Sequence, residues 1–347
     1  MNADAFFQSF WYQRSQSFWS LLLTPLAWLF HGVVALRRLA FKTGLVGATR
    51  ISRPVIVVGN ITVGGTGKTP LTLWLAAQLR SKGFTPGIVL RGYRGSSPTW
   101  PRDVMPDSLP REVGDEAVVL AGLSGGIVVA GPDRVAAARR AIERGADVIL
   151  SDDGLQHYRL SRDCELVVVD ADRGLGNGRL LPAGPLREPA ARLDRVDAVV
   201  LRTSRQGAAM AETAATLQTS VPVVSFSVRS ATLRSLASGE RRTLESFRGQ
   251  PVHAVAGIGN PERFFATLRD AGMAVTPHAL PDHAVIVQTA LEFGDSLPVL
   301  MTEKDAVKCR GLDGSRLWAV SAGVDMDGPQ AMQLLSVVER CIAAART

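Results

Sequence analysis

Short apolar runs alternate with helical stretches along the chain after residue 53. The run at residues 54–60, PVIVVGN, is apolar at almost every position, as expected for a strand that is buried on both faces. A helical stretch follows from Thr69 to about Lys82 and ends at Gly83. Further apolar runs lie at 85–93, 124–131, 146–154, 164–172 and 196–203, with a helical stretch at 133–144. This alternation predicts an α/β fold with a doubly wound parallel sheet, whose ligands bind at the carboxyl ends of the strands.

A second, smaller α/β unit begins near residue 251. An apolar run and a helical stretch share residues 252–273. Later pieces of the unit are PVLMTEKDAVK at 298–308, RLWAVSAGV at 316–324, and residues 334–345, which have the pattern of a carboxy-terminal helix. The segment 226–250, between the two units, is polar and lacks a sustained period, which suggests a linker or a short hairpin. We therefore expect two domains with a cleft between them.

The amino-terminal segment has a different pattern. Residues 18–36, FWSLLLTPLAWLFHGVVAL, contain no Asp, Glu, Lys or Arg, and a helix that crosses a bilayer core needs about 20 apolar residues. A basic cluster follows directly, which by the positive-inside tendency places the rest of the chain in the cytosol. The cluster consists of Arg37, Arg38, Lys42 and Arg50. We expect residues 1–50 to form a membrane-associated helix with a basic flank.

The depth of that association stays open at the level of sequence. Pro25, His31 and Gly32 each weaken a helix in lipid or cost free energy there, so a helix that lies in the interface agrees with the pattern as well as a full span does. The structural alternative is a buried helix at the start of a soluble domain.

Composition narrows the class of protein. Hydrophobic residues make up 46% of the 347 positions and charged residues only 20%, which excludes a disordered chain. Three scattered cysteines exclude a disulfide framework and offer no metal-ligand spacing. The formal charge of +7 does not indicate nucleic-acid binding, because aromatic residues are few and no basic run contains interleaved stacking residues. Only five of the 39 basic residues are lysines: Lys42, Lys68, Lys82, Lys304 and Lys308.

The strongest local motif is GNITVGGTGKTP at residues 59–70. A strand, a glycine-rich turn and then Lys and Thr at the start of a helix are typical of a P-loop, in which backbone amides cradle the phosphates of a nucleotide. Lys68 would reach the β- and γ-phosphates of ATP, and the Thr69 hydroxyl would bind Mg²⁺. The expected nucleotide-binding residues of the loop are Gly64, Gly65, Thr66, Gly67, Lys68 and Thr69. The alternative is a glycine-rich turn without a ligand.

Two adjacent carboxylates, Asp152 and Asp153, close the apolar run 146–154. A P-loop enzyme needs a further carboxylate for Mg²⁺ at this edge of the sheet, and two neighbouring carboxylates repel each other unless a cation lies nearby. We therefore expect Thr69, Asp152 and Asp153 to form the metal site. The alternative is ordinary turn chemistry at the end of a strand.

Taken together, several segments resemble the tetraacyldisaccharide 4′-kinases of lipid A biosynthesis. The matching residues are the P-loop at 59–70, RGYRG at 91–95, VGDE at 113–116, GPDR at 131–134, SDDGLQH at 151–157, LLPAGPLREP at 180–189, GIGNPERF at 257–264, PDH at 281–283 and MTEKDAVK at 301–308. The resemblance implies transfer of the γ-phosphoryl group of ATP, with Mg²⁺, to the 4′-hydroxyl of a tetraacyl glucosamine disaccharide 1-phosphate, giving lipid IVA. It also implies a cytoplasmic-face location at a bacterial inner membrane, with the lipid A precursor and membrane lipids as partners. No nucleic acid and no obligate protein partner are expected.

The resemblance also implies roles for residues outside the P-loop. Asp115 is similar to the catalytic carboxylate of the family, although a Gly-Asp-Glu sequence before an apolar stretch also suits a helix cap. His283, in the second domain, would pair with it only if the domains close. Arg91 and Arg134 would contact the triphosphate or a substrate phosphate through their planar guanidinium groups, or else be solvated surface charges. Lys304 and Asp305 are expected to form an ion pair without a chemical role.

The resulting interpretation is a P-loop nucleotide-binding kinase domain at 51–225, a linker or hairpin at 226–250, and a C-terminal α/β domain at 251–347 that closes over the cleft. A different class of protein remains as the alternative function: a membrane-recruited P-loop ATPase or nucleotide switch that acts through a protein partner. The P-loop and the apolar segment would suit either.

Overall fold

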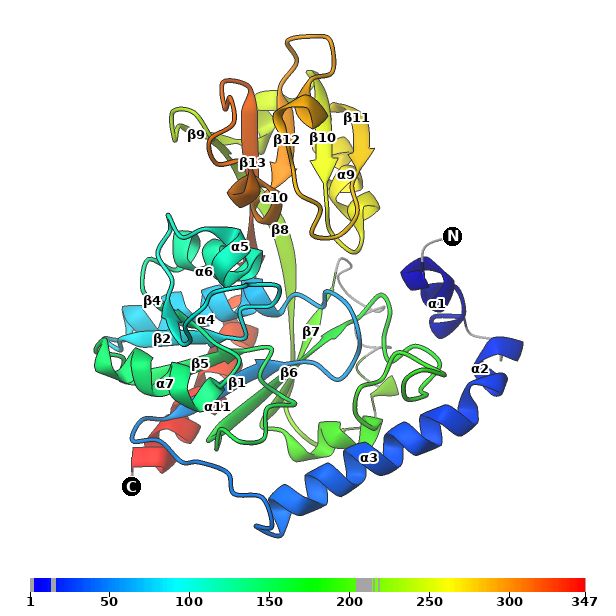
Figure 1. Ribbon diagram of the computed structural model, residues 1–347, viewed down its shortest axis with the longest axis vertical. Coiled ribbons are helices and arrows are strands. Elements are labelled where there is room, and N and C mark those ends of the chain that lie inside the picture. Colours follow the sequence, from blue (N-terminus) through cyan, green and yellow to red (C-terminus); the bar gives the residue numbers. More distant parts are fainter. Residues whose placement is uncertain (1–2, 14–16, 204–213, 215, 218, 347) are drawn as a thin grey trace.

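The computed structural model describes residues 3–13, 17–203, 214, 216–217 and 219–346, which form two lobes (Figure 1). The first lobe is built on parallel strands in the order β7-β6-β1-β5-β2-β4, with the short β3 antiparallel at the edge. Their bounds are β1 Val55–Gly59, β2 Pro86–Leu90, β3 Arg102–Asp103, β4 Ile127–Ala130, β5 Val148–Asp152, β6 Cys164–Asp170 and β7 Ala198–Arg202. The central strands are buried along their whole length because helices or loops cover both faces of the sheet.

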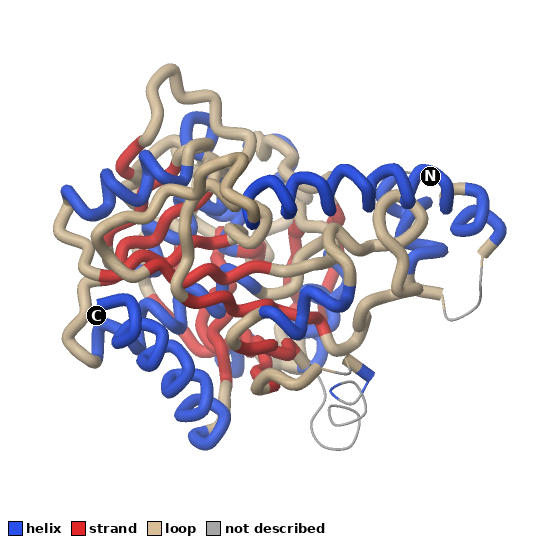
Figure 2. Tube along the Cα trace, turned by 90° about the horizontal axis from the view of Figure 1, so that it is seen from below, coloured by secondary structure: helices blue, strands red, loops and turns tan. Residues whose placement is uncertain are grey.

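Helices on both faces of this sheet confirm the doubly wound fold (Figure 2). Helices α4, α6 and α11 pack into the core on one face, and α7 and the 3₁₀-helix η1 pack into the core on the other. The bounds are α4 Lys68–Ser81, α5 Pro110–Val113, α6 Asp115–Ser124, α7 Arg134–Glu143, η1 Ala190–Arg195 and α11 Gly328–Arg346. Although α11 comes from the segment 251–347, its buried Leu334, Val338 and Ile342 belong to the core of the first lobe.

The second lobe continues the same sheet in the order β8-β13-β12-β10-β11. Its strands are β8 Val223–Ser235, β9 Arg241–Thr243, β10 Pro251–Ala256, β11 Ala274–Ala279, β12 Val299–Thr302 and β13 Leu317–Asp325. Its helices are α9 Pro261–Asp270, α10 Glu303–Ala306 and the 3₁₀-helices η2 Leu244–Phe247, η3 Gln288–Leu291 and η4 Val307–Cys309. Strands β10 to β13 are parallel, whereas β8 is antiparallel to β13 and pairs with β9 as a hairpin.

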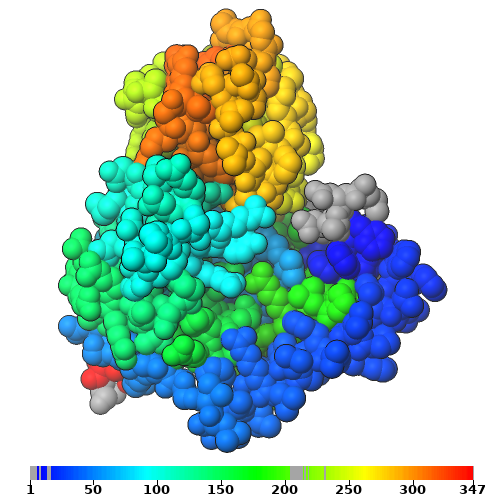
Figure 3. Space-filling model, viewed as in Figure 1, coloured from blue at the N-terminus to red at the C-terminus, as the bar shows by residue number. Residues whose placement is uncertain are grey.

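Strand β8 joins the two lobes. Its first residues, from Val223 to Phe226, pair in parallel with β7, and its later residues, from Ser227 to Ser235, pair with β13. The second lobe rests on the surface formed by α5 and α6 of the first lobe (Figure 3). Because β8 pairs with a strand of each lobe, the second lobe is attached to the first by backbone hydrogen bonds as well as by side-chain contacts.

The amino-terminal residues form three helices on the outside of the first lobe: α1 Ala3–Trp11, α2 Phe18–Leu22 and α3 Thr24–Lys42 (Figure 1). Pro25 lies in the first turn of α3, where a missing amide hydrogen costs no hydrogen bond, and the helix continues through His31 and Gly32. Trp11 anchors α1 by donating from Nε1 to the carbonyl of Pro182 at 2.9 Å.

Much of the apolar surface of α2 and α3 faces outward. The exposed side chains are Phe18, Trp19, Leu21, Leu22, Leu26, Trp28, Leu29, Val33, Leu36 and Leu39. Four of them, Leu26, Leu29, Val33 and Leu36, follow the spacing of one helix face. The interpretation of this segment as a buried core helix is therefore wrong. Across the described residues, no helix combines the length and the hydropathy that a membrane span requires.

We predict that Gly59→Ala destabilises the first lobe. A Cβ at Gly59 would lie 2.5 Å from Cβ of Leu155, so one of the two buried segments must move. Overpacking of this kind costs about 1–3 kcal/mol in the free energy of unfolding. Gly65→Ala is the matched control, because nothing lies within 4 Å of a Cβ at Gly65. Urea unfolding followed by circular dichroism measures both, and equal midpoints for Gly59→Ala and the control would contradict the packing argument.

Candidate active site

The P-loop connects the carboxyl end of β1 to the start of α4. Gly67 caps α4 with a φ of +97°, and Gly64 has a φ of +107°, which is backbone that favours glycine. A Cβ at Gly67 would also lie 2.8 Å from Cδ of Arg202. The loop thus needs glycine at both positions, and its conformation agrees with a phosphate cradle at the amino terminus of a long helix.

Two buried side-chain oxygen atoms in this region lack partners within the described part of the chain. They are the buried Oγ1 of Thr66 and Oδ1 of Asn60. Buried polar atoms are nearly always hydrogen-bonded in folded proteins, so these orphans agree with a site that a ligand completes.

Asp152 lies at the end of β5, directly beside β1 in the sheet. Its carboxylate is buried and accepts hydrogen bonds from the hydroxyls of Thr69 and Thr72, each at 3.1 Å. Burial, together with the nearby negative charge of Glu116, raises the pKa of Asp152 to about 6. A hydroxyl and a carboxylate oxygen at the phosphate loop are the ligands that Mg²⁺ prefers, and a dication would offset the cost of the buried negative charge.

The neighbouring Asp153 has a different environment. Its carboxylate lies 3.5 Å from Nζ of Lys68 and 3.5 Å from Nη1 of Arg187. Burial alone would raise the pKa of Asp153, but Lys68 and Arg187 outweigh it and hold the pKa below its ordinary value. Asp153 also adopts a φ of +48°, a left-handed conformation that is uncommon for non-glycine residues. Hydrogen bonding within a turn at the end of a strand does not explain why Asp152 is buried beside hydroxyl groups while Asp153 lies between two cations.

The two predicted arginines are placed very differently. Arg134 is only 3% exposed, and its guanidinium donates to the carbonyl of Gly131 at 2.9 Å and to the carbonyl of Asp152 at 3.5 Å. Burial lowers the pKa of Arg134 to about 10. The interpretation as a solvated surface charge is therefore wrong for Arg134, which ties the end of β4 to the end of β5. Arg91 is exposed just after β2.

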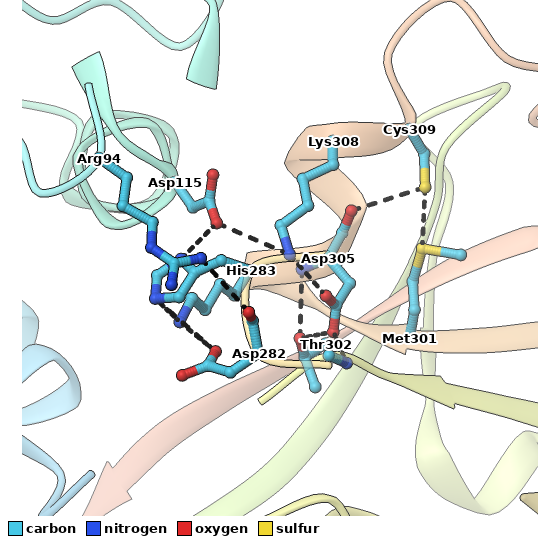
Figure 4. Close-up of polar contacts among 11 residues, drawn as sticks. Arg94, Asp115, Asp282, His283, Met301, Thr302, Asp305, Lys308 and Cys309 are labelled. Atoms are coloured by element: carbon cyan, nitrogen blue, oxygen red, sulfur yellow. Dashed lines mark hydrogen bonds and ion pairs between the residues drawn. The ribbon is translucent and has the colours of Figure 1, made fainter. Parts of the chain in front are cut away.

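Asp115 and His283 meet across the two lobes (Figure 4). Asp115 lies in the first turn of α6, and His283 lies in the turn after β11, with Nδ1 of His283 3.0 Å from Oδ2 of Asp115. The helix is capped at Gly114, and Asp115 makes no capping hydrogen bond, so the capping interpretation of Asp115 is wrong. His283 has a φ of +62°, which again places a strained backbone at the site.

The partners of His283 assign its tautomer. Nε2 lies 3.2 Å from the ammonium of Lys304, which can only donate, so Nε2 accepts and Nδ1 carries the proton that is donated to Asp115. Lys304 also donates to Oδ1 of Asp282 at 2.9 Å.

The expected ion pair between Lys304 and Asp305 is wrong. Lys304 pairs with Asp282 instead, and Asp305 pairs with Lys308 at 3.0 Å. Consecutive residues of a helix point in different directions, whereas residues three apart lie on one face.

The cysteines correct a further expectation. The ligand-type atoms of Cys164, Cys341 and Asp197 lie within 4.8 Å of one another, although their spacing along the chain gives no sign of it. A hydrogen bond to Cys341 and burial raise the pKa of Cys164. This cluster joins β6 to α11.

Lys308 is the residue at this site whose role the sequence did not reveal. Its Nζ lies 3.6 Å from Oδ2 of Asp115, and its side chain is only 8% exposed. Two signals in the sequence could have singled it out: the scarcity of lysine in an arginine-rich chain and its place in the segment MTEKDAVK at 301–308.

Comparisons with known proteins agree with these observations. The family described as LpxK, tetraacyldisaccharide-1-P 4′-kinase, matches residues 19–339. The tetraacyldisaccharide 4′-kinase of Alkalilimnicola ehrlichii is 51% identical over 310 residues, which cover 89% of this chain and 90% of that protein. The protein of the same name from Nitrosococcus oceani is 46% identical over 332 residues, covering 95% and 94%. A structure of apo-form LpxK from Aquifex aeolicus in complex with ATP is similar, with a TM-score of 0.76 and 27% identity over 93% of this chain and 99% of that one.

We predict that Asp152→Asn stabilises the nucleotide-free protein at neutral pH. Because the pKa of Asp152 is raised from 3.8 to about 6 in the folded state, its ionisation costs stability as pH rises from about 4, and the cost is complete above about pH 6. The stability gained by the variant should therefore grow from near zero at pH 4 to about 3 kcal/mol at pH 7.5. Thermal or urea unfolding across this range measures it.

Asp153→Asn is the matched comparison and should behave in the opposite way. The lowered pKa of Asp153 contributes stability that is present above pH 3.8 and is lost as pH falls through the folded-state value. This variant should be less stable than the native chain at neutral pH. A gain in stability that is equal at all pH values for Asp152→Asn would refute the assigned environment.

Proposed function

The chain belongs to the LpxK family of tetraacyldisaccharide-1-P 4′-kinases, and on this basis we propose how its residues carry out the reaction. It is an enzyme of lipid A biosynthesis, an ATP-dependent kinase that transfers the γ-phosphoryl group to the 4′-hydroxyl of a tetraacyl disaccharide 1-phosphate. The observation that carries the proposed mechanism is the contact of 3.0 Å between Asp115 and His283, which joins a carboxylate of the P-loop lobe to an imidazole of the second lobe.

Asp115 acts as the general base in this proposal. A sugar hydroxyl is a weak nucleophile until a base accepts its proton, and a carboxylate in the catalytic position does this in kinases. Since Nδ1–H of His283 donates to Oδ2 of Asp115, the imidazole holds the carboxylate in one orientation. The 4′-hydroxyl of the acceptor then loses its proton to Asp115 as its oxygen bonds to the γ-phosphorus and ADP leaves.

The P-loop binds the nucleotide. The backbone amides around Gly64 to Gly67 and the amino terminus of α4 face the phosphates, and Lys68 supplies a compact positive charge for the β- and γ-phosphates. Arg91, exposed just after β2, would contact the triphosphate or a substrate phosphate in this proposal. Arg134 contributes by fixing the backbone of Asp152 through its hydrogen bond to that carbonyl.

Thr69, Asp152 and Asp153 would hold Mg²⁺. The buried carboxylate of Asp152, with its raised pKa and its hydrogen bond from Thr69, supports this assignment. When bound, the metal neutralises charge on the β- and γ-phosphate oxygens. Asp153, paired with Lys68, orients that lysine toward the loop.

The enzyme acts at the cytoplasmic face of a bacterial inner membrane in this proposal. Its acceptor carries four acyl chains and stays in the leaflet, so the enzyme must come to the lipid. The exposed apolar side chains of α2 and α3, with two tryptophans among them and a basic flank at Arg37, Arg38 and Lys42, suit a helix that lies in the lipid interface. Membrane lipids are accordingly its proposed partners.

The alternative of a nucleotide switch is not favoured. A switch needs no base next to an acceptor site, whereas the interlobe pair of Asp115 and His283 has no role in binding a nucleotide, and the relatives are named as kinases.

We predict that Asp115→Asn lowers kcat by about 10²–10⁴-fold while leaving the affinity for ATP unchanged, because the proton acceptor is lost and the P-loop is intact. The measurement is transfer of γ-labelled phosphate to tetraacyl disaccharide 1-phosphate in mixed micelles, with ATP binding followed separately. Asp107→Asn, at an exposed position, is the control. Native turnover by Asp115→Asn would remove this residue from the mechanism.

We predict that the triple variant Leu29→Gln, Val33→Gln, Leu36→Gln binds vesicles of anionic phospholipid at least about tenfold more weakly than the native chain, since it removes apolar surface from one face of α3. Co-sedimentation measures the binding. Met332→Gln, at an exposed apolar position on α11, is the control. Equal partitioning of the triple variant and the control would exclude α3 as the membrane-binding face.

A further inference from the structure

A buried lysine lies between two carboxylates from different lobes (Figure 4). Nζ of Lys308, in η4, is 3.0 Å from Oδ1 of Asp305 and 3.6 Å from Oδ2 of Asp115. The Lys308 side chain is 8% exposed. An ammonium is strongly hydrated, so its burial is tolerated only where anionic partners surround it.

Asp305 holds this ammonium in place. The carboxylate is fully buried, and its Oδ2 accepts hydrogen bonds from the amide of Gly257 at 3.0 Å and from the hydroxyl of Thr302 at 2.7 Å. Its Oδ1 is then aimed at Lys308. A Cβ at Gly257 would lie 2.9 Å from that same Oδ1, so glycine is needed for the close approach. The end of β10 thus sets the position of the Lys308 ammonium through Asp305.

The two ammonium groups at the site pair with different carboxylates of the second lobe. From the second lobe come the carboxylates of Asp282 and Asp305, the ammonium groups of Lys304 and Lys308, and the imidazole of His283. From the first lobe come Asp115 and the guanidinium of Arg94, which donates to the carbonyl of Asp282 at 3.4 Å, with the ring of Tyr93 5.6 Å from that of His283. Lys304 pairs with Asp282, so within the described residues Lys308 is the cation that faces Asp115.

A base must be ionised and correctly aimed before it can accept a proton. His283 donates to one oxygen of the Asp115 carboxylate, and a single contact does not by itself fix the orientation of a carboxylate. Lys308 supplies a second, cationic contact from the second lobe, on the same oxygen that His283 contacts.

We propose that Lys308 is a positioning residue for the kinase reaction, whose ammonium, held by Asp305, holds the Asp115 carboxylate in one orientation when the second lobe lies against α6. This inference rests on the proposed role of Asp115 as the base and deepens it. Asp115 then has both of its partners, the Lys308 ammonium and the His283 imidazole, only when the second lobe lies against the first.

The test is the kinetics of Lys308→Ala with and without an added amine. We expect kcat to fall about 10- to 100-fold with the KM for ATP within about twofold of the native value, because the P-loop is not touched. Ethylammonium chloride should restore part of the lost kcat by occupying the space of the missing side chain. Tetramethylammonium chloride at the same concentration, which has the charge but no N–H donor and a larger radius, should not.

Gly257→Ala provides a second variant that alters neither Lys308 nor Asp115. Its Cβ would lie 2.9 Å from Oδ1 of Asp305 and 3.2 Å from the carbonyl oxygen of Pro281, so we expect Asp305 to move and kcat to fall in the same direction, again with little change in the KM for ATP. Lys82→Ala is the control, since Lys82 pairs with Glu339 between α4 and α11 and should have native kinetics. If Lys308→Ala fails to fold, Gly257→Ala still tests whether Asp305 and Lys308 position the Asp115 carboxylate.

Asp115→Asn, assayed in parallel, distinguishes failure of the proposed base from failure of the proposed role of Lys308. Native turnover by Asp115→Asn would overturn the proposed base itself. An inactive Asp115→Asn together with native kcat for Lys308→Ala would overturn only the role of Lys308. A defect in Lys308→Ala that ethylammonium and tetramethylammonium leave equally unchanged, with native kcat for Gly257→Ala, would also overturn it, because the lysine would then serve only to stabilise the fold.

Discussion

Strand β8 is shared by the two lobes, and the geometry of the active site depends on this shared strand. Its first residues extend the parallel sheet beyond β7, and its remaining residues pair with β13. The turn that carries His283 and the short helices α10 and η4 are thereby held over the start of α6. Arg263 strengthens the connection by pairing with Asp170 at 3.1 Å. Neither lobe contains a complete site, because the nucleotide loop and Asp115 belong to one and the partners of Asp115 belong to the other.

This arrangement separates two tasks that a kinase must perform. The first lobe holds two carboxylates in different environments. Asp152 is buried among hydroxyl groups and its pKa is raised, whereas Asp153 beside it pairs with Lys68 and its pKa is lowered. Two adjacent carboxylates are therefore chemically distinct because of their surroundings. The second lobe presents an imidazole and an ammonium to a single carboxylate oxygen of Asp115, the group that we propose as the base for proton transfer. Many P-loop proteins perform the first task, and the second is what makes this site suited to a hydroxyl acceptor.

The features predictable from the sequence are those that local chemistry determines. Continuous apolar runs marked the buried strands, and the glycines with Lys68 and Thr69 marked the loop, because backbone conformation and strand burial act over a few residues. Asp115 and His283 are 168 positions apart, and no periodicity links them; their pairing was expected from family resemblance alone. The packing of α11 on the first lobe, the approach of Cys164 to Cys341, and the partners of Lys304 and Lys308 all follow from tertiary contacts. For Lys304, the nearest carboxylate in the sequence was the wrong one because adjacent helical residues diverge.

The difference in shape between an ammonium and a guanidinium group accounts for where this chain uses lysine in its long-range contacts. In a chain with 39 basic residues and only five lysines, three of the five face carboxylates at the P-loop or near the contact between the lobes: Lys68, Lys304 and Lys308. A guanidinium is planar, wide and restricted to a fixed fork of donors, whereas an ammonium is compact and donates along three directions. Lys308 fits between two carboxylates with almost no exposure, and Lys304 contacts a carboxylate and an imidazole nitrogen together. Arginine serves elsewhere in the chain, for example where Arg134 bridges two carbonyl groups, because there the fork matches its partners. The choice of cation thus follows the shape of the space between its partners.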